Sequence, residues 1–335
     1  MKGLVVKSTG SSYIVRMDDG SDAECHVKGN FRIRGIRSTN PVAVGDYVEI
    51  SLTDDAGPTA QAVLQQSGLT GDAGHIGWIT DVCDRRNYIV RRATNLSKES
   101  HILAANIDQV ALIVTINHPV TSTTFIDRFL ATCEAYRVRA ILIFNKIDLL
   151  TEEELAQLAE LRALYESIGY ETLAISAKNL SPFTSHLSPL FEGKTTLLSG
   201  NSGVGKSTLL NALFGKEVTR TGKISDAHDK GMHTTTFSEM YFLDEANSQE
   251  PIAKSRIIDT PGIKGFGTID FEKEEVSHYF REIFQTGREC RFGNCTHTNE
   301  PGCAVQEAII KGNIAISRYE SYLSLLGDCT ESKYR

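Results

Sequence analysis

The sequence lacks the features that mark membrane, secreted and fibrous proteins. No apolar run approaches the roughly 20 residues needed to span a bilayer, and Met1-Lys2-Gly3 does not open a signal peptide. The 335 residues include only 8 prolines and 1 tryptophan, and 41% are hydrophobic, which is typical of a globular chain. This length allows two or three domains. We therefore expect a soluble, cytoplasmic protein with no membrane partner.

Cysteine and positive charge are also limited. The seven cysteines are an odd number, and three of them lie close together near the C-terminus, which favours a metal site over a disulfide framework. The net charge of −7 disfavours a partner bound mainly through phosphate neutralisation. Two acid-free stretches are exceptions, and each is either a solvated face or an RNA contact. They contain Lys28, Arg32, Arg34 and Arg37, and Arg85, Arg86, Arg91, Arg92 and Lys98.

A phosphate-binding loop is the strongest motif in the chain. Residues 200–207 fit G-x-x-x-x-G-K-S between a β-prone segment, 195–199, and a segment with helical spacing. Such a loop points backbone N–H groups at phosphate oxygens, and the following helix adds its positive end. Lys206 would contact the β- and γ-phosphates, and Ser207 would bind Mg²⁺. A chance glycine-rich turn is the alternative. The predicted phosphate-binding residues are Gly200, Asn201, Ser202, Gly203, Val204, Gly205, Lys206, Ser207 and Thr208.

Two other segments favour guanine over adenine. Asn145-Lys146-Ile147-Asp148 follows the buried-type strand 139–144, and α/β sheets bind ligands at the carboxyl ends of their strands. Asp148 can accept both guanine N–H donors, whereas adenine would leave this carboxylate unpaired. The alternative role for Asp148 is the N-cap of a helix that begins near Glu152. Ser176-Ala177-Lys178, after the strand 172–175, resembles the second guanine loop of translation-factor-type GTPases.

A magnesium and γ-phosphate segment completes the nucleotide motifs. Asp259-Thr260-Pro261-Gly262 follows the strand 255–258 and resembles the GTPase motif whose Asp holds Mg²⁺, usually through water, and whose Gly N–H contacts the γ-phosphate. Between this motif and the phosphate loop lies Gly231-Met232-His233-Thr234-Thr235-Thr236, where a threonine could close over Mg²⁺. We expect Thr235 to do so, with Thr234 and Thr236 as alternatives. A threonine-rich strand edge would explain the same residues.

A Cys/His cluster lies near the C-terminus. Cys290, Cys295, His297 and Cys303 have the spacing C-x4-C-x-H-x5-C, which supplies three thiolates and one imidazole. These are the four ligands of a closed tetrahedral zinc site. With four protein ligands no position stays open for catalysis, so we expect one structural Zn²⁺ that stabilises a small appendage.

The order of the nucleotide motifs is unusual. The guanine segments at 145 and 176 precede the phosphate loop at 200, whereas a Ras-like chain begins at its phosphate loop. This order predicts a circularly permuted GTPase domain, which is tolerated because the termini of compact domains lie close together. Alternating strand-like and helix-like segments, the latter at 125–136 and 152–168, predict a mostly parallel, doubly wound α/β sheet.

The flanking segments predict two more domains. Short β-prone runs at 3–7, 12–17, 23–27 and 44–52 predict a small all-β barrel, followed by a connection or irregular last strand at 54–74. We expect a helix at 271–284 and one or two closing helices within 305–326. The predicted domains are residues 1–74, 75–270 with a bridging segment at 75–105, and 271–335.

These motifs and their order resemble the ribosome small-subunit-dependent GTPase A family of bacteria. The resemblance covers nearly the whole chain, and its most specific parts are residues 145–148, 200–208, 233–236 and 259–262 and the Cys/His cluster. It implies an N-terminal OB-fold that contacts RNA, a central permuted P-loop GTPase domain and a C-terminal helical zinc domain. It also implies a monomeric GTPase that binds the small ribosomal subunit and its rRNA during late assembly and hydrolyses GTP to GDP and phosphate.

The catalytic group differs from that of Ras-like enzymes. Those enzymes have a glutamine directly after the Gly of the Asp259 motif, but here Ile263 occupies this position and cannot polarise water. The resemblance implies that His233 orients the water instead; a surface histidine is the alternative. We therefore expect slow hydrolysis that the ribosome stimulates. Two rival functions are a guanine-nucleotide-regulated RNA chaperone with incidental turnover, and an ATP-dependent kinase or ATPase, which Asp148 argues against.

Overall fold

The computed structural model describes residues 1–9, 12–27, 41–52, 75–92, 100–180, 187–219, 238–243, 255–260 and 271–331. The chain forms two compact units. The first combines residues 1–108, 181–199 and 213–262, and the second combines residues 109–180, 200–212 and 263–335. None of the helices within the described ranges is long and apolar enough to cross a membrane.

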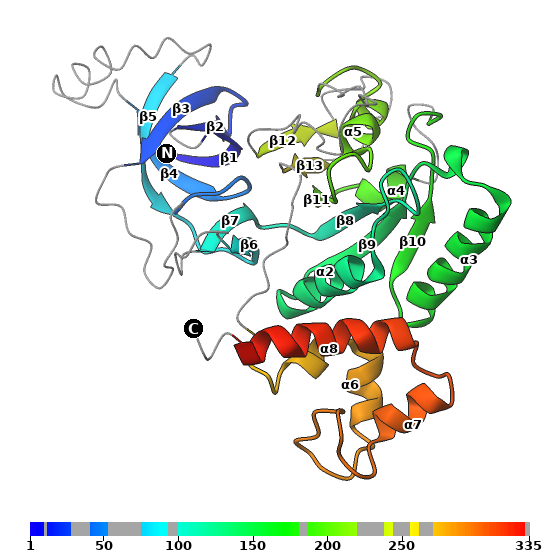
Figure 1. Ribbon diagram of the computed structural model, residues 1–335. Helices are drawn as coiled ribbons and strands as arrows, with labels where there is room; N and C mark the ends of the chain where they lie inside the picture. The colour runs from blue at the N-terminus through cyan, green and yellow to red at the C-terminus, as the bar shows by residue number, and fades with distance from the viewer. Residues whose placement is uncertain are drawn as a thin grey trace. The chain divides into compact units, whose positions relative to one another are not determined.

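The first unit begins with a closed barrel (Figure 1). Its strands are β1 (Lys2–Ser8), β2 (Tyr13–Met17), β3 (Asp22–Val27), β4 (Tyr47–Leu52) and β5 (His75–Val82). They pair in the order β1-β2-β3-β5-β4, and β4 returns to β1, while β3 and β5 run parallel. Alternate residues face the interior, where Val5, Val15, Val48 and Ile79 are buried. The predicted N-terminal barrel with the pairing of an OB-fold is confirmed.

Residues 75–105 contribute more structure than a simple bridge. The strand β5 belongs to the barrel, although it lies beyond the expected boundary at residue 74. A hairpin of β6 (Tyr88–Arg92) and β7 (Ser100–Ala105) follows it. In the segment between β5 and β6, the buried Arg85 side chain donates to both carboxylate oxygens of the buried Asp46 at 2.6 Å. The Arg85 guanidinium is thus engaged by Asp46 inside the protein and is not available for an RNA contact.

The first unit also contains three strands from the nucleotide-binding part of the chain. They are β11 (Thr195–Ser199), β12 (Glu239–Phe242) and β13 (Arg256–Asp259), preceded by the short helix α4 (Ser188–Phe191). β11 and β13 are parallel neighbours, and β12 runs antiparallel on the other side of β13. In this pair of strands, Leu198 lies opposite Asp259. The phosphate loop begins two residues later, at Gly200.

The second unit contains a parallel sheet in the order β8 (Gln109–Val114), β9 (Arg139–Phe144) and β10 (Glu171–Ala174). All residues of β8 are buried, as expected for a strand covered on both faces. The helices α2 (Thr123–Ala135) and α3 (Glu152–Ser167) connect these strands. Ser122 caps α2 by accepting the Phe125 N–H at 3.2 Å. The helix α5 (Lys206–Phe214) follows the phosphate loop.

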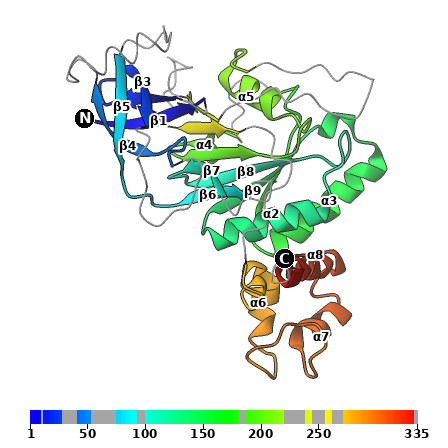
Figure 2. The ribbon, with the colours of Figure 1, turned by 60° about the vertical axis from the view of Figure 1, so that its left-hand side comes forward.

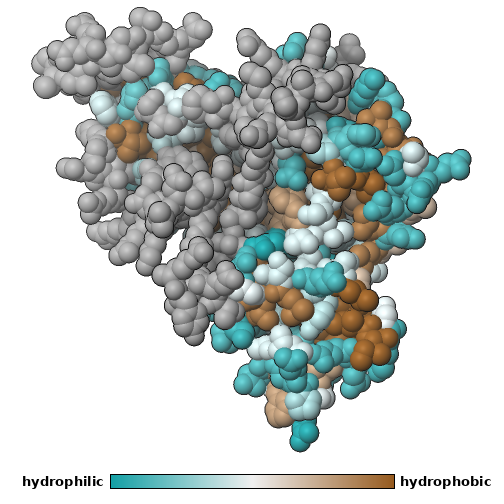
Figure 3. Space-filling view, viewed as in Figure 1, coloured by the Kyte–Doolittle hydropathy of each residue, from teal (hydrophilic) through white to brown (hydrophobic). Residues whose placement is uncertain are grey.

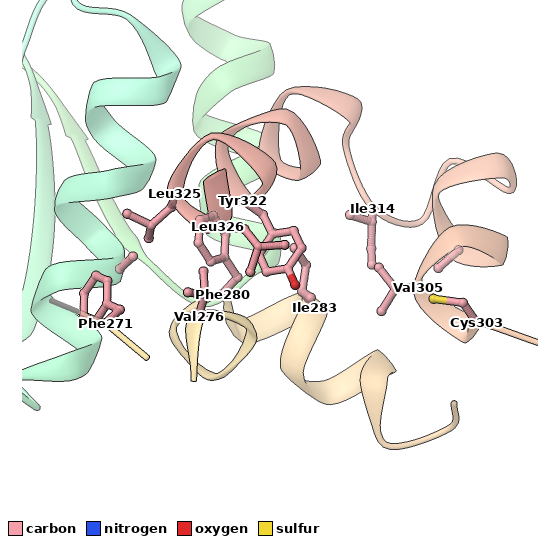
Figure 4. Close-up of a cluster of buried hydrophobic side chains, with 12 residues drawn as sticks. Phe271, Val276, Phe280, Ile283, Cys303, Val305, Ile314, Tyr322, Leu325 and Leu326 are labelled. Atoms are coloured by element: carbon pink, nitrogen blue, oxygen red, sulfur yellow. The ribbon is translucent and has the colours of Figure 1, made fainter. Parts of the chain in front are cut away.

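The C-terminal part of the second unit is helical (Figures 1 and 2). It contains the 3₁₀ turn η4 (Val276–Tyr279), α6 (Arg281–Gly287), α7 (Ala304–Ile310) and α8 (Ile316–Glu331). The two closing helices are confirmed, whereas the single helix expected at 271–284 is wrong. Phe280 is extended (φ −113°, ψ 101°) and fully buried. The break in the helix lets the Phe280 ring pack edge-on against the Tyr322 ring, with the ring centroids 5.6 Å apart (Figure 4).

Candidate nucleotide and metal sites

The phosphate loop connects β11 to α5 through a turn that needs glycine. Gly200 and Gly205 have φ angles of 141° and 99°. A Cβ on Gly200 would lie 2.3 Å from the Ile113 carbonyl oxygen, and one on Gly205 would lie 2.4 Å from Nδ2 of Asn145. The backbone conformation and the lack of space therefore both require glycine at these positions. Lys206 Nζ donates to the carbonyls of Gly200 at 2.8 Å and Asn201 at 2.9 Å, which holds the ammonium over the loop.

Asn145 joins the three predicted nucleotide segments of the second unit. Its buried side chain donates from Nδ2 to the Val204 carbonyl of the phosphate loop at 2.8 Å. Its Oδ1 accepts the backbone N–H of Ala177 at 2.9 Å. One side chain therefore fixes the phosphate loop and the Ser176-Ala177-Lys178 loop to the end of β9. The motifs predicted that these three segments share a site, but no sequence pattern indicated that Asn145 joins them.

Lys146 and Asp148 follow Asn145 in a tight bend. Lys146 is left-handed (φ 66°), and its ammonium donates to the carbonyl of His118. Burial lowers the pKa of Lys146, although Asp148 opposes this change. Asp148 lies in the 3₁₀ turn η2 (Ile147–Leu149) with an exposed side chain. It does not cap α3; Thr151 is the N-cap and accepts the Glu154 N–H at 3.3 Å. The helix-cap alternative for Asp148 is therefore wrong.

In the predicted magnesium and γ-phosphate segments, the structure describes Asp259 and Thr260 of residues 259–262 and none of residues 231–236. Asp259 is buried at the end of β13, and the Thr260 hydroxyl donates to the Leu198 carbonyl at 3.4 Å. His233, Thr234, Thr235, Thr236 and Gly262 lie outside the described residues, as do Lys28, Arg32, Arg34, Arg37 and Lys98 of the two basic stretches. The proposed roles of these residues stay predictions.

The four predicted metal ligands converge. The ligand atoms of Cys290, Cys295, His297 and Cys303 all lie within 4.8 Å of one another. Nδ1 of His297 is 3.6 Å from Cys290 Sγ and 3.5 Å from Cys303 Sγ, and the two sulfurs are 4.0 Å apart. Tetrahedral zinc with Zn–S near 2.3 Å and Zn–N near 2.0 Å separates its ligand atoms by about 3.5–3.8 Å. The cluster therefore fits a closed four-coordinate metal ion.

Hydrogen bonds from other residues shape the ligand loop. The Glu300 carboxylate accepts the backbone N–H groups of Thr296 at 2.7 Å and Thr298 at 2.9 Å. Burial raises the pKa of Glu300, but hydrogen bonds from Thr296 and Thr298 outweigh it and lower the value to about 2. From α8, Tyr322 donates to the Thr296 carbonyl and Tyr319 to the His297 carbonyl, both at 2.7 Å. The metal loop is thus fastened to α8.

A buried charge network fastens α8 in turn to the rest of the second unit. Arg318 of α8 donates from Nη1 to Asp127 of α2 at 2.8 Å and from Nε to Glu282 of α6 at 2.6 Å. Arg318 and Asp127 are 1% and 0% exposed, and Tyr165 of α3 donates to Asp127 at 2.9 Å. No local sequence pattern indicates this network, because Asp127 and Arg318 are almost 200 positions apart.

Comparisons with known proteins agree with this geometry. A family model described as RsgA GTPase matches residues 82–269, and one described as RsgA N-terminal domain matches residues 2–57. A Phocaeicola vulgatus protein named small ribosomal subunit biogenesis GTPase RsgA is 55% identical over 335 residues, covering 100% of this chain and 99% of the relative. A Porphyromonas gingivalis protein of the same name is 54% identical with the same coverage.

Two solved structures are similar over nearly their full length. YjeQ from Thermotoga maritima is 30% identical with a TM-score of 0.68, covering 98% of both chains. YloQ, which is described as a circularly permuted GTPase, is 26% identical with a TM-score of 0.65, covering 100% of this chain and 96% of that one. The permuted order inferred from the motifs is therefore confirmed.

Proposed function

This chain belongs to the RsgA GTPase family and is a GTP hydrolase, and we propose that it acts in the biogenesis of the small ribosomal subunit. The relatives whose names state this role match the whole chain at up to 55% identity. Within the structure, the observation that carries the GTPase assignment is Asn145, because its amide ties the phosphate loop to the second guanine segment. This arrangement supports the assignment of both motifs to one nucleotide site.

The nucleotide would be held by the phosphate loop, the two guanine segments and the magnesium segment. Residues 200–208 would hold the phosphates, Asp148 would accept the guanine N–H donors, and Asn145, Lys146 and the 176–178 loop would frame the base. Magnesium would be bound by Ser207, Thr235 and Asp259, the last through water, and its charge would stabilise the charge that develops on the phosphates. Gly262 would contact the γ-phosphate, and His233 would orient the attacking water.

The two flanking parts would bind the ribosome. We assign RNA contacts to the barrel and a structural Zn²⁺ to the Cys/His cluster, whose donor set and spacing suit that ion. Zinc held by four protein ligands would brace the loop at 290–303 and take no part in hydrolysis. We also propose that the protein is a cytoplasmic monomer whose partners are the small subunit and its rRNA.

The decisive measurement is the initial rate of GTP hydrolysis with and without small ribosomal subunits. We expect strong stimulation by the small subunit, none by the large subunit, and no hydrolysis of ATP. Such stimulation would arise if the small subunit favours the conformation of the site that is competent for hydrolysis. A rate unchanged by small subunits, in protein that binds GTP and zinc, would instead support an RNA-binding chaperone with incidental turnover.

A further inference from the structure

The segment that carries Asp148 is fastened at both ends to two consecutive residues, Asn117 and His118. At its start, the Lys146 ammonium donates to the His118 carbonyl. Just beyond its end, Asn117 Nδ2 donates to Glu154 Oε1 at 2.8 Å. The second carboxylate oxygen of Glu154 accepts the N–H of Thr151, the N-cap of α3, at 2.9 Å. The neighbouring residues Asn117 and His118 thus hold both ends of the bend between Lys146 and Thr151.

The loop that provides these contacts is itself rigidly braced. Thr115 Oγ1 donates to the Pro119 carbonyl at 2.5 Å, and the Thr121 N–H donates to the Thr115 carbonyl at 3.0 Å. Oδ1 of Asn117 accepts the His118 N–H at 2.9 Å, so both ends of the Asn117 amide are engaged. This side chain therefore has a fixed orientation, with its NH₂ group toward Glu154.

We propose that Asn117 and Glu154 form a positioning pair that aims Asp148 at guanine. The inference rests on the proposed guanine-binding role of Asp148, and it assigns new residues to the selection of the base. Neither member of the pair needs to touch the nucleotide. The exposed η2 turn is held at its start, where the Ile147 N–H donates to the Ile175 carbonyl at 3.2 Å, and the pair holds the chain just beyond its end. A carboxylate held in place before binding loses less freedom when it pairs with the base.

The charge state of Glu154 suits this role. Hydrogen bonds from the Thr151 backbone and from the Asn117 side chain lower its pKa, so the group is ionised at neutral pH. An ionised carboxylate accepts both hydrogen bonds at once, one on each oxygen. An amide at this position offers only one acceptor oxygen, and it would have to give up either Thr151 or Asn117.

The contacts allow a rescue experiment with exchanged donors. Asn117→Asp places a carboxylate against Glu154, and Glu154→Gln removes one acceptor. In the double variant, the amide nitrogen at position 154 donates to the carboxylate at position 117, and its oxygen still accepts the Thr151 N–H. We expect Asn117→Asp to raise the Kd for GDP about tenfold, because it replaces a hydrogen bond with like-charge repulsion. The double variant should return to within about threefold of the wild-type Kd.

Inosine diphosphate separates positioning from general loosening of the site, because it lacks the 2-amino donor that Asp148 would bind. If the pair aims Asp148, Asn117→Asp weakens GDP more than inosine diphosphate, and the preference for GDP falls. Equal weakening of both nucleotides, or a double variant no better than Asn117→Asp, would overturn the proposal. Glu153→Gln, an exposed carboxylate in the same helical turn, is the matched control and should leave both Kd values unchanged.

One further variant separates this inference from the proposed function. Asp148→Ala should abolish the preference for GDP over inosine diphosphate. If it leaves that preference intact, Asp148 does not bind the base and the proposed guanine site is wrong. If Asp148→Ala removes the preference and Asn117→Asp does not change it, the guanine site stands and the positioning pair alone is wrong.

Discussion

Gly205 of the phosphate loop has little freedom to change. Its φ of 99° disfavours any side chain, and a Cβ would lie 2.4 Å from the Asn145 amide nitrogen. Gly203 has a similar φ of 84°, but a Cβ there would meet only Pro119 at 3.5 Å. A comparison of substitutions at Gly203 and Gly205 therefore separates the effect of backbone strain from the effect of a steric clash with Asn145. The motif predicted a glycine at position 205, but only the structure shows which neighbour requires it.

We expect Gly205→Ala to weaken GDP binding more than Gly203→Ala. Strain alone costs on the order of 1–3 kcal/mol in either variant. At position 205 the methyl group would also displace Asn145 and leave the buried Val204 carbonyl unpaired, which adds about 1–3 kcal/mol. Titration with a fluorescent GDP analogue measures both affinities. Equal losses in the two variants would show that Asn145 does not organise the loop.

His233 offers a second test at the scale of one residue. If it orients the attacking water, His233→Ala should leave the Kd for GTP within about twofold of wild type. The rate of hydrolysis stimulated by small subunits should fall by roughly 10²–10⁴-fold, the usual contribution of a positioned acid–base group. Single-turnover kinetics at saturating GTP measure the step directly. Full stimulated turnover in the variant would remove His233 from the mechanism.

At the scale of strands and helices, the sequence predicted elements well where local periodicity or a motif marks them. The strands β1 to β4, β9 and β11 and the helices α2, α3 and α8 lie at or near the segments that β-prone residues or helical spacing indicated. The barrel strand β5 was harder to predict, because it pairs with β3 and β4 across intervening residues. The break at Phe280 follows from packing against Tyr322, which no local pattern records.

The packing of α8 provides a prediction at the same scale. Replacing Arg318 by Met would leave Asp127 buried without its counter-charge, which costs about 3–5 kcal/mol. The control is Arg128→Met, because Arg128 pairs with Asp328 at the surface and such pairs are worth roughly 0–1 kcal/mol. Urea unfolding followed by circular dichroism compares them. Similar losses in both variants would contradict the importance of the buried network.

The loss in the Arg318 variant should also depend on pH. Burial already raises the pKa of Asp127, and Arg318 is the main group that opposes this rise. Without Arg318 the folded-state pKa rises further above the unfolded value, so the folded variant gains stability by taking up a proton as the pH falls. The difference in stability from wild type should therefore be smaller at about pH 5 than at about pH 8.

At the scale of the whole chain, compact units do not follow the order of the sequence. The C-terminal helices belong to the same unit as α2 and the guanine segments. Phe271, Val276, Phe280 and Leu325 form one buried cluster with Ala131 of α2 (Figure 4). The helical part also exposes both polar and apolar residues (Figure 3). Ile310 and Ile316 are among the exposed apolar side chains. The core of this unit is therefore shared between segments that lie far apart in the sequence.

This shared core predicts how far the loss of the metal would spread. Cys295→Ser removes one ligand and should reduce bound zinc from about one equivalent to near zero. Because Thr296 and His297 hold Tyr322 and Tyr319 of α8, disorder in the loop should loosen α8 and then α2, which binds α8 through Arg318. Hydrogen exchange read by mass spectrometry should therefore speed up in the loop, α8 and α2, but not in β1 to β4. Cys83→Ser, a half-buried cysteine of the first unit, is the control and should change none of these. Faster exchange confined to residues 290–303 would show that the metal supports only its own loop.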